Sequence, residues 1–199
     1  MKVFIYLFLG IALFSCKQQN SGSELETQLI KQGFVLKNLS GSDAKRATKY
    51  GIDGKYIIEE GFLRNGRKNG IWVTYYDNYQ QRLKSVCNYV DDVLEGTFLN
   101  LDYMSRADLS TRFENGKLEG FRATYRLTTP IDYSEYKNGK LDGTFRAFNE
   151  YGMLTRQAVY QNGELNGPTV FFDNTGNKET AILEFIYKNG TKVSERKIK

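Results

Sequence analysis

The stretch Tyr136-Lys137-Asn138-Gly139-Lys140-Leu141-Asp142-Gly143 decides the fold of this 199-residue chain. Asn-Gly between alternating residues predicts a β-hairpin, because both central positions of a type I′ turn need positive φ. The turn at Asn138 and Gly139 predicts four cross-strand pairs: Lys137 with Lys140, Tyr136 with Leu141, Glu135 with Asp142, and Ser134 with Gly143. Strand alternation then makes one face of the hairpin apolar and the other charged.

The same pattern recurs about every 24 residues. The turn glycines are Gly66, Gly116, Gly139, Gly163 and Gly190, each preceded by Asn, and Asp91-Asp92 takes this place in a degenerate copy. Four residues after the turn comes a second glycine, at Gly70, Gly96, Gly120, Gly143 and Gly167, whereas Ser194 stands there in the last copy. One hairpin cannot bury its own face, so neighbouring hairpins must stack. The sequence therefore predicts an all-β fold, an extended antiparallel sheet of successive hairpins over residues 61–199.

Each copy carries aromatic residues after its second glycine. We expect that glycine to be where a ring from a neighbouring strand lies flat on the backbone. Rings stand two positions on, at Trp72, Phe98 and Phe145, and five positions on, at Tyr75, Tyr125, Phe148 and Phe172. Two and five have opposite parity, so either both faces of the sheet are covered or a bulge intervenes.

Residues 1–15 have the build of a secretory signal peptide, with a basic start, an apolar core and a small residue at the end. The apolar run over residues 3–14 would rise about 18 Å as a helix, which is too short for a bilayer core of roughly 30 Å. Leu13-Phe14-Ser15-Cys16 resembles the lipobox of bacterial lipoproteins. This resemblance implies that Cys16 is lipidated, with chains such as palmitate, and becomes the first mature residue. The alternatives are an ordinary signal peptide cut nearby and a buried N-terminal strand.

Residues 16–60 form a lipidated tether and a lead-in to the repeats. Ser23 and Glu26 have capping-box spacing and predict a short helix over 24–32, followed by a strand from Phe34 and a loop over 41–46. Lys17 follows the cysteine, and the first acidic residue is Glu24. In lipoproteins of enteric type, an Asp directly after the lipidated cysteine keeps the protein at the inner membrane, and in some Bacteroidetes-like lipoproteins an acidic cluster just downstream directs it to the cell surface. By resemblance to these proteins, the absence of acidic residues directly after Cys16 implies the outer membrane, facing the periplasm.

The composition excludes several kinds of catalytic site. The chain has no histidine, which removes Ser-His-Asp and Cys-His catalysis. With Cys16 lipidated, Cys87 is a lone thiol that we interpret as a core residue. Asp91-Asp92 with Glu95 lacks the oxygen ligands of a cation cage and is interpreted as a polar turn. Glycoside hydrolysis needs two acids that face one cleft. The candidate acids are Glu59, Glu60, Glu119, Glu135 and Asp142, which we interpret as a solvated face. We expect no catalytic residue, metal or cofactor.

Charge bears on the kind of partner. Removal of residues 1–15 takes away one lysine and no acid, leaving 27 basic and 23 acidic residues and a net charge of +4. Both signs are mixed along the chain, so we expect no nucleic acid. The candidate binding surface combines recurring cations after the turns with the second set of rings: Arg67, Lys117 and Lys140 with Tyr75, Tyr125, Phe148 and Phe172. The alternative for the cations is protection of strand ends against aggregation.

The repeat, an aromatic residue, any residue, Asn-Gly, three residues, then Gly, resembles the MORN repeat over about Phe62 to Lys192. The closest resemblance is to the bacterial variant described as antitoxin-like. MORN-like arrays imply a sheet of successive hairpins that serves as a non-catalytic binding platform for proteins or lipids. We therefore expect an envelope lipoprotein that binds a protein or an envelope component. The alternatives are an antitoxin or immunity protein that neutralises a cognate partner and, more weakly, a carboxylate-based hydrolase.

Overall fold

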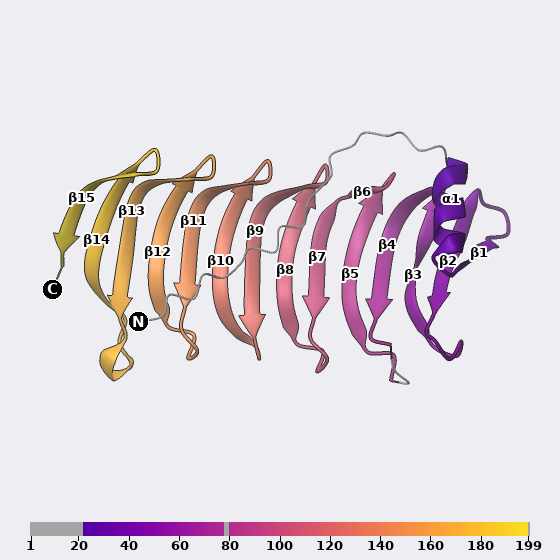
Figure 1. Cartoon of the computed structure of the whole chain (residues 1–199), viewed down its shortest axis with the longest axis horizontal. Coiled ribbons are helices and arrows are strands. Elements are labelled where there is room, and N and C mark those ends of the chain that lie inside the picture. Colours follow the sequence, from indigo (N-terminus) through magenta and orange to yellow (C-terminus); the bar gives the residue numbers. More distant parts are fainter. Residues whose placement is uncertain (1–21, 78–79, 199) are drawn as a thin grey trace.

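The computed structural model describes residues 22–77 and 80–198 and shows one long antiparallel sheet with a short N-terminal helix (Figure 1). The all-β hairpin array predicted from the sequence is confirmed. The predicted signal peptide, Cys16 and residues 17–21 of the predicted tether lie outside the described residues. Among those described, no helix combines the length and apolar character that a membrane span requires.

The helix α1 covers Gly22–Lys31, and a 3-10 turn covers Thr175–Asn177. The first seven strands are β1 (Phe34–Asn38), β2 (Ala44–Tyr50), β3 (Ile57–Arg64), β4 (Arg67–Tyr75), β5 (Leu83–Val90), β6 (Val93–Leu94) and β7 (Gly96–Leu101). The remaining eight are β8 (Ala107–Glu114), β9 (Lys117–Arg126), β10 (Thr129–Lys137), β11 (Lys140–Phe148), β12 (Leu154–Gln161), β13 (Glu164–Asp173), β14 (Thr180–Lys188) and β15 (Thr191–Lys197).

Strands follow one another across the sheet in chain order, with the short β6 paired to β5 beside this path. The sheet therefore has two long edges formed by strand ends (Figure 1). The tight Asn-Gly turns lie on one, which we call the turn edge. The alternate connections, from β2–β3 to β13–β14, lie on the other, the loop edge. The sheet begins at Phe34, and residue 61, where the predicted array starts, lies inside β3.

The predicted pairs next to the turns are confirmed, and those further away are wrong. Tyr136 pairs with Leu141 and Lys137 with Lys140, but Ser134 pairs with Phe145 instead of Gly143. The residues 142–144 bulge opposite Glu135, so Glu135 does not pair with Asp142. The bulge follows from Gly143, whose φ of +119° departs from the extended strand.

The prediction that an aromatic ring packs on the second glycine of each copy is wrong. Added Cβ atoms at Gly70 and Gly96 would meet no heavy atom within 4 Å. What these positions share is positive φ, between 73° and 121° at Gly70, Gly96, Gly120, Gly143 and Gly167. The expected packing of a ring on a glycine occurs at Gly61 instead, where a Cβ would collide with the indole of Trp72.

Both faces of the sheet carry aromatic rings, as expected for two sets of rings at positions of opposite parity. Paired residues share a face, and Phe145 pairs with Ser134 on one side and Ala158 on the other, both fully buried. Small residues therefore receive the first set of rings. The second set, at Tyr75, Tyr125, Phe148 and Phe172, lies on the opposite face. The bulges beside the second set place their extra residues in the neighbouring strands, so alternation between the two sets of rings is unbroken and the alternative in which both faces are covered is correct.

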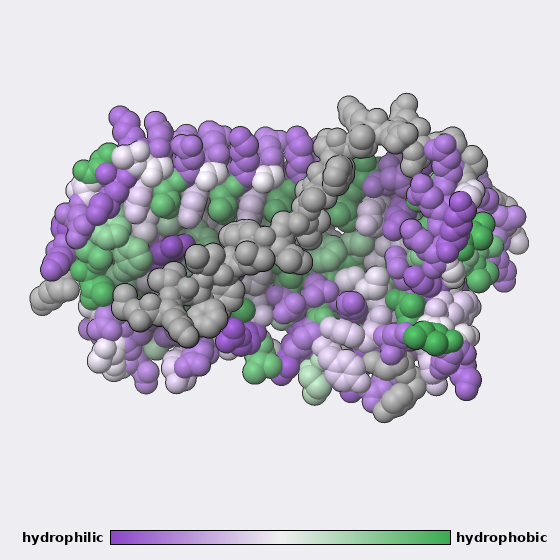
Figure 2. All heavy atoms as spheres, in the orientation of Figure 1, coloured by the Kyte–Doolittle hydropathy of each residue, from purple (hydrophilic) through white to green (hydrophobic). Residues whose placement is uncertain are grey.

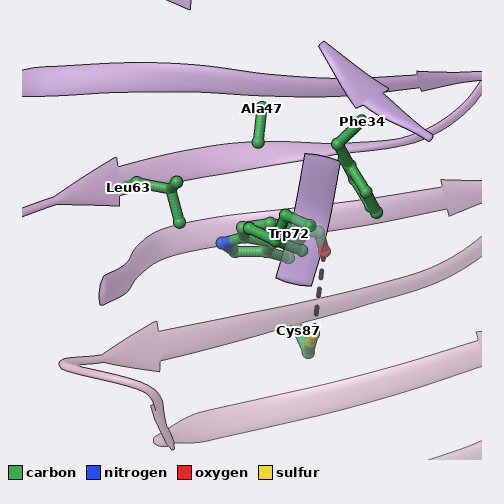
Figure 3. Close-up of a cluster of buried hydrophobic side chains, with 6 residues drawn as sticks. Phe34, Ala47, Leu63, Trp72 and Cys87 are labelled. Carbon is green, nitrogen blue, oxygen red and sulfur yellow. Dashed lines mark hydrogen bonds between the residues drawn. The ribbon is translucent and has the colours of Figure 1, made fainter. Parts of the chain in front are cut away.

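The largest core lies at the end of the sheet that α1 covers. Leu29 of α1 packs with Phe34, Ala47, Leu63, Trp72 and Cys87 (Figure 3). We call this side of the sheet the α1 face. Trp72 donates from Nε1 to the carbonyl oxygen of Phe62 at 3.2 Å.

The N-terminal lead-in differs from its prediction in two details. The helix begins at Gly22, two residues early, and the carboxylate of Glu26 binds Lys45 Nζ at 2.6 Å. The predicted loop over 41–46 is wrong from Ala44 onward, because β2 starts there and pairs with both β1 and β3.

Candidate functional site

Backbone hydrogen bonds join each turn to the hairpin before it. The N–H of Gly139 donates to the carbonyl oxygen of Leu118 at 2.8 Å, and Gly163 donates to Leu141 at 2.7 Å. Equivalent bonds run from Gly116 to Leu94 and from Gly190 to Leu165, both at 2.9 Å. The turn glycines therefore hold the hairpins in a fixed order. The degenerate turn follows this plan, since Asp91 and Asp92 both have positive φ and the Asp92 N–H donates to the carbonyl of Lys68.

Carboxylates reinforce the same junctions. Glu119 accepts from the backbone N–H of Asn138 at 2.7 Å, and Asp142 accepts from that of Asn162 at 3.0 Å. Glu95 does the same for Asn115 at 2.9 Å. Glu119 and Asp142, interpreted from the sequence as part of a solvated face, hold the next turn, and so does Glu95, which was interpreted as part of a polar turn. The signal was present in the sequence, because an acid precedes the second glycine in three successive copies.

The predicted binding residues do not form one surface. Arg67, Lys117 and Lys140 are the first strand residues after their turns, so they lie on the turn edge. The rings of Tyr75, Tyr125, Phe148 and Phe172 lie at the far ends of their strands. Lys117 and Tyr125 are separated by about 26 Å along β9, given a rise of about 3.3 Å per residue. In Figure 2, hydrophilic side chains line the turn edge and hydrophobic ones form a band below them.

One predicted ring belongs to a polar cluster on the face opposite α1. Tyr75 Oη donates to Glu60 Oε1 at 3.1 Å, and the other oxygen of Glu60 binds the guanidinium of Arg46. Burial, and secondarily the hydrogen bond to Glu60, raises the pKa of Tyr75. A hollow of about 420 Å³ lies beside this cluster and includes the half-exposed Phe62 and Ile71 in its wall.

A second cluster lies on the α1 face. Lys68 Nζ is 4.0 Å from the ring centroid of Trp72 and 5.1 Å from that of Tyr89. Desolvation lowers the pKa of Lys68 and raises that of Tyr89 to about 12. Burial also raises the pKa of the Cys87 thiol, whose Sγ lies 3.8 Å from the carbonyl oxygen of Trp72. Cys87 is thus a protonated core residue, consistent with its interpretation from the sequence.

The candidate carboxylates do not converge. Glu59 and Glu60 are neighbours in β3 and point to opposite faces. Glu135 accepts from the backbone N–H of Thr144 at 2.6 Å and from Tyr133 Oη, while Glu119 and Asp142 hold different turns. Within residues 22–77 and 80–198, no three potential metal-ligating side chains come together.

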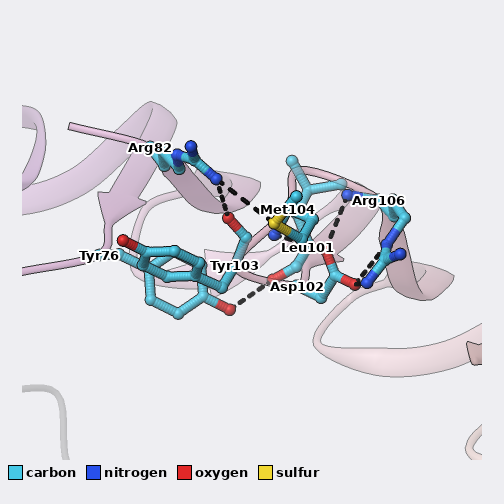
Figure 4. A network of polar contacts seen from close by, with 7 residues as sticks. All are labelled: Tyr76, Arg82, Leu101, Asp102, Tyr103, Met104 and Arg106. Carbon is cyan, nitrogen blue, oxygen red and sulfur yellow. Dashed lines mark hydrogen bonds and ion pairs between the residues drawn. The ribbon is translucent and has the colours of Figure 1, made fainter. Parts of the chain in front are cut away.

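The loop edge carries a network that sequence reasoning missed (Figure 4). Tyr76 Oη donates to the carbonyl of Leu101 at 2.8 Å, and the rings of Tyr76 and Tyr103 lie 5.4 Å apart. The guanidinium of Arg82 lies 4.9 Å from the Tyr103 ring and donates to the Tyr103 carbonyl. The loops themselves are ordered by Asp102, which accepts from the backbone N–H groups of Met104 and Arg106.

Comparison with known proteins adds no family. No protein-family model and no curated protein matches the chain. Among solved structures, it is similar to S. aureus TarM in complex with fondaparinux, alpha-GlcNAc-glycerol and UDP, at 9% identity and a TM-score of 0.30 over 88% of this chain. A second TarM structure gives the same identity and TM-score over 91% of this chain. This chain spans 24% of the length of each, and so distant a likeness supports no argument about fold or function.

Proposed function

We propose that this protein is a non-catalytic envelope lipoprotein whose hairpin array is a binding platform for another protein or envelope component. The observation that carries the proposal is the array itself. Fourteen strands follow in order across one sheet, and the five junctions from the turn at Asp91-Asp92 to the turn at Asn189-Gly190 repeat the same backbone bond. Such an arrangement presents a long, regular surface, as in other quasi-one-dimensional repeat proteins. Its acids serve the junctions between hairpins, which supports binding over catalysis.

The lipid anchor is the part of this proposal that is tested first. The motif Leu13-Phe14-Ser15-Cys16 supports attachment at Cys16. Attachment predicts that the protein fractionates with membranes and incorporates an alkyne-tagged fatty acid. Cys16→Ala should abolish labelling and release the protein into the soluble fraction, because acyl chains supply the membrane affinity.

Cys87→Ala is the matched control, since Cys87 is the other cysteine and is buried in the core. Labelling and membrane fractionation should both survive that change. Unchanged labelling of the Cys16→Ala protein, or its continued sedimentation with membranes, would refute the anchor.

A further inference from the structure

Exposed apolar side chains gather on the loop edge. Met104 is 60% exposed, Leu127 62% and Tyr151 77%, and Tyr103 and Ile131 are also exposed. Tyr103, Met104, Leu127 and Tyr151 come from three consecutive connections of the loop edge, β7–β8, β9–β10 and β11–β12, and Ile131 lies near the start of β10. We call these five residues the loop-edge patch. Adjacent connections lie two strands apart, which is about 10 Å. Exposed apolar side chains gathered along one border of a protein surface are a candidate interaction site.

The β9–β10 turn presents its leucine at a conformational cost. Leu127 and Thr128 have φ of 51° and 81°, in the left-handed region that disfavours residues with a β-carbon. On the turn edge the same two-residue geometry is made by Asn-Gly, as at Asn138 and Gly139. Asn-Gly would therefore form the β9–β10 turn with less backbone strain, yet the chain has Leu-Thr there. Strain held at an exposed position indicates a role outside folding.

A hollow of about 290 Å³ lies within the patch. Its wall includes Arg126, Pro130, Ile131, Phe148 and Asn149, from the ends of β9 to β11. Phe148 is one of the predicted binding residues. The hollow has room for one apolar side chain of a partner, in the manner of a hot-spot pocket.

The charges around the patch favour an acidic partner. Within the described part of the chain, Arg82, Lys84 and Arg126 form no ion pair, and Arg106 is already bound to Asp102 at 2.7 Å. The acids on this side are Glu150 beside the hollow and Asp108, whose carboxylate accepts from Asn100 Nδ2 at 3.2 Å, so the three cations outnumber them. Arg82 lies against Tyr103, so its charge and the ring form one contact surface (Figure 4). Arginine and tyrosine side by side are typical of interface centres.

The start of α1 gives the orientation of the patch. Asn38 pairs with Lys45 near the turn edge, and Phe34 pairs with Lys49 nearer the loop edge. Since α1 enters β1 at Phe34, the other end of the helix, Gly22, lies toward the turn edge (Figure 1). Six residue steps separate Cys16 from Gly22, a reach of about 20 Å. If Cys16 holds the chain to a bilayer, as proposed above, the turn edge lies nearer the membrane and the loop edge faces away.

We infer that the loop-edge patch docks a protein that approaches from the side away from the membrane. The partner's contact surface carries an apolar side chain that enters the hollow and carboxylates that meet Arg82, Lys84 and Arg126. The inference rests on the proposed binding function, and it uses the anchor only for orientation.

Site-specific photocrosslinking in intact cells tests the position of the surface. The photoreactive residue p-benzoylphenylalanine replaces Tyr103 or Tyr151 on the patch, and Lys140 on the turn edge as the control. The expected result is one adduct of defined mass with another protein from both patch positions and none from Lys140. An adduct from Lys140 of equal yield, an adduct with lipid or a second copy of this chain, or no adduct from either patch position would overturn the inference.

The crosslinked protein, once identified and purified, tests the chemistry. L127N/T128G replaces the strained turn with Asn-Gly, so its melting temperature should rise while its affinity for the partner falls about tenfold or more. K140D should leave the affinity unchanged. Unchanged affinity in L127N/T128G would overturn the inference. The binding assay uses soluble protein with Cys16→Ala, so failure of the anchor and failure of the docking surface are read separately.

Discussion

At Gly143, a hydrogen atom in place of a side chain sets the local course of the strand. The residue has φ of +119°, and a Cβ would collide with the carboxylate of Glu135. Gly143→Val should lower the free energy of unfolding by about 1–3 kcal/mol, measured by urea denaturation. Gly96→Val is the control, because Gly96 has positive φ in open space. Equal losses in the two variants would show that the contact with Glu135 has no part in the effect.

Leu127 and Thr128 predict the opposite effect. Each non-glycine residue in the left-handed region costs roughly 1–2 kcal/mol. L127N/T128G should therefore raise the free energy of unfolding by about 1–2 kcal/mol, measured by the same denaturation. The reverse change at the turn edge, Asn138→Leu, should be destabilising. A loss of stability in L127N/T128G would mean that the exposed leucine contributes more to folding than its strain removes.

Tyr89 predicts a loss of stability at alkaline pH. Its folded pKa of about 12 lies above the ordinary value near 10, chiefly because of desolvation. The contribution of Tyr89 to stability is fully present below pH 10 and is lost as the pH rises from 10 toward 12. Denaturation at pH 9 and 11 should show a smaller loss in Tyr89→Phe than in the parent. Lys68, whose pKa is lowered, changes stability with pH in the opposite direction. Because both proteins contain Lys68, its contribution cancels when they are compared.

At the scale of the hairpin, the carboxylate before the second glycine holds the following turn. Asp142→Ala removes the acceptor for the backbone N–H of Asn162 and should cost about 0.5–1.5 kcal/mol in thermal or urea unfolding. Glu114→Ala is the matched control, since Glu114 also lies on the turn edge and accepts no side-chain hydrogen bond within the described residues. A cost in Glu114→Ala as large as in Asp142→Ala would assign the effect to general charge.

The hairpins could be predicted from sequence because their signals are local. Asn138 and Gly139 specify their own turn, and the pairs beside it follow. The bulge at residues 142–144 could not be predicted, since it depends on the φ of Gly143 and on Glu135 across the strand. The loop-edge patch could not be predicted from the sequence either. The β9–β10 turn consists of Leu127 and Thr128, whereas the residues typical of turns are Asn, Gly and Pro.

Across the whole molecule, the two ends of the array differ. At one end, α1 covers the core around Trp72. At the other, β15 is exposed along its length and lacks the repeating junction residues: Lys192 replaces the leucine, Val193 the acid and Ser194 the second glycine. The last hairpin therefore does not offer the next one the contacts that hold the others together. Lys192 instead pairs with Glu195 at 2.9 Å.

This asymmetry predicts a gradient in local stability. Hydrogen exchange measured by mass spectrometry should show rapid exchange in β14–β15 and the strongest protection in β3–β5, because opening begins where fewer contacts must break. Leu29→Ala, which weakens the α1 contact, should raise exchange in β3–β5 and leave β14–β15 unchanged. Uniform exchange along the sheet would show that the array unfolds as one unit.

Adjacent hairpins are joined both by strand pairing, as between β9 and β10, and by the bond from a turn glycine to the preceding leucine carbonyl, and these contacts set how the molecule would respond to mechanical load. If the chain is held at its N-terminus and pulled through a bound partner, the force acts along the sheet and the junctions between hairpins break one after another. Each detached hairpin would release about 24 residues, or about 80 Å of contour length. The protein would then lengthen in equal steps, while the hairpins that have not yet detached stay folded.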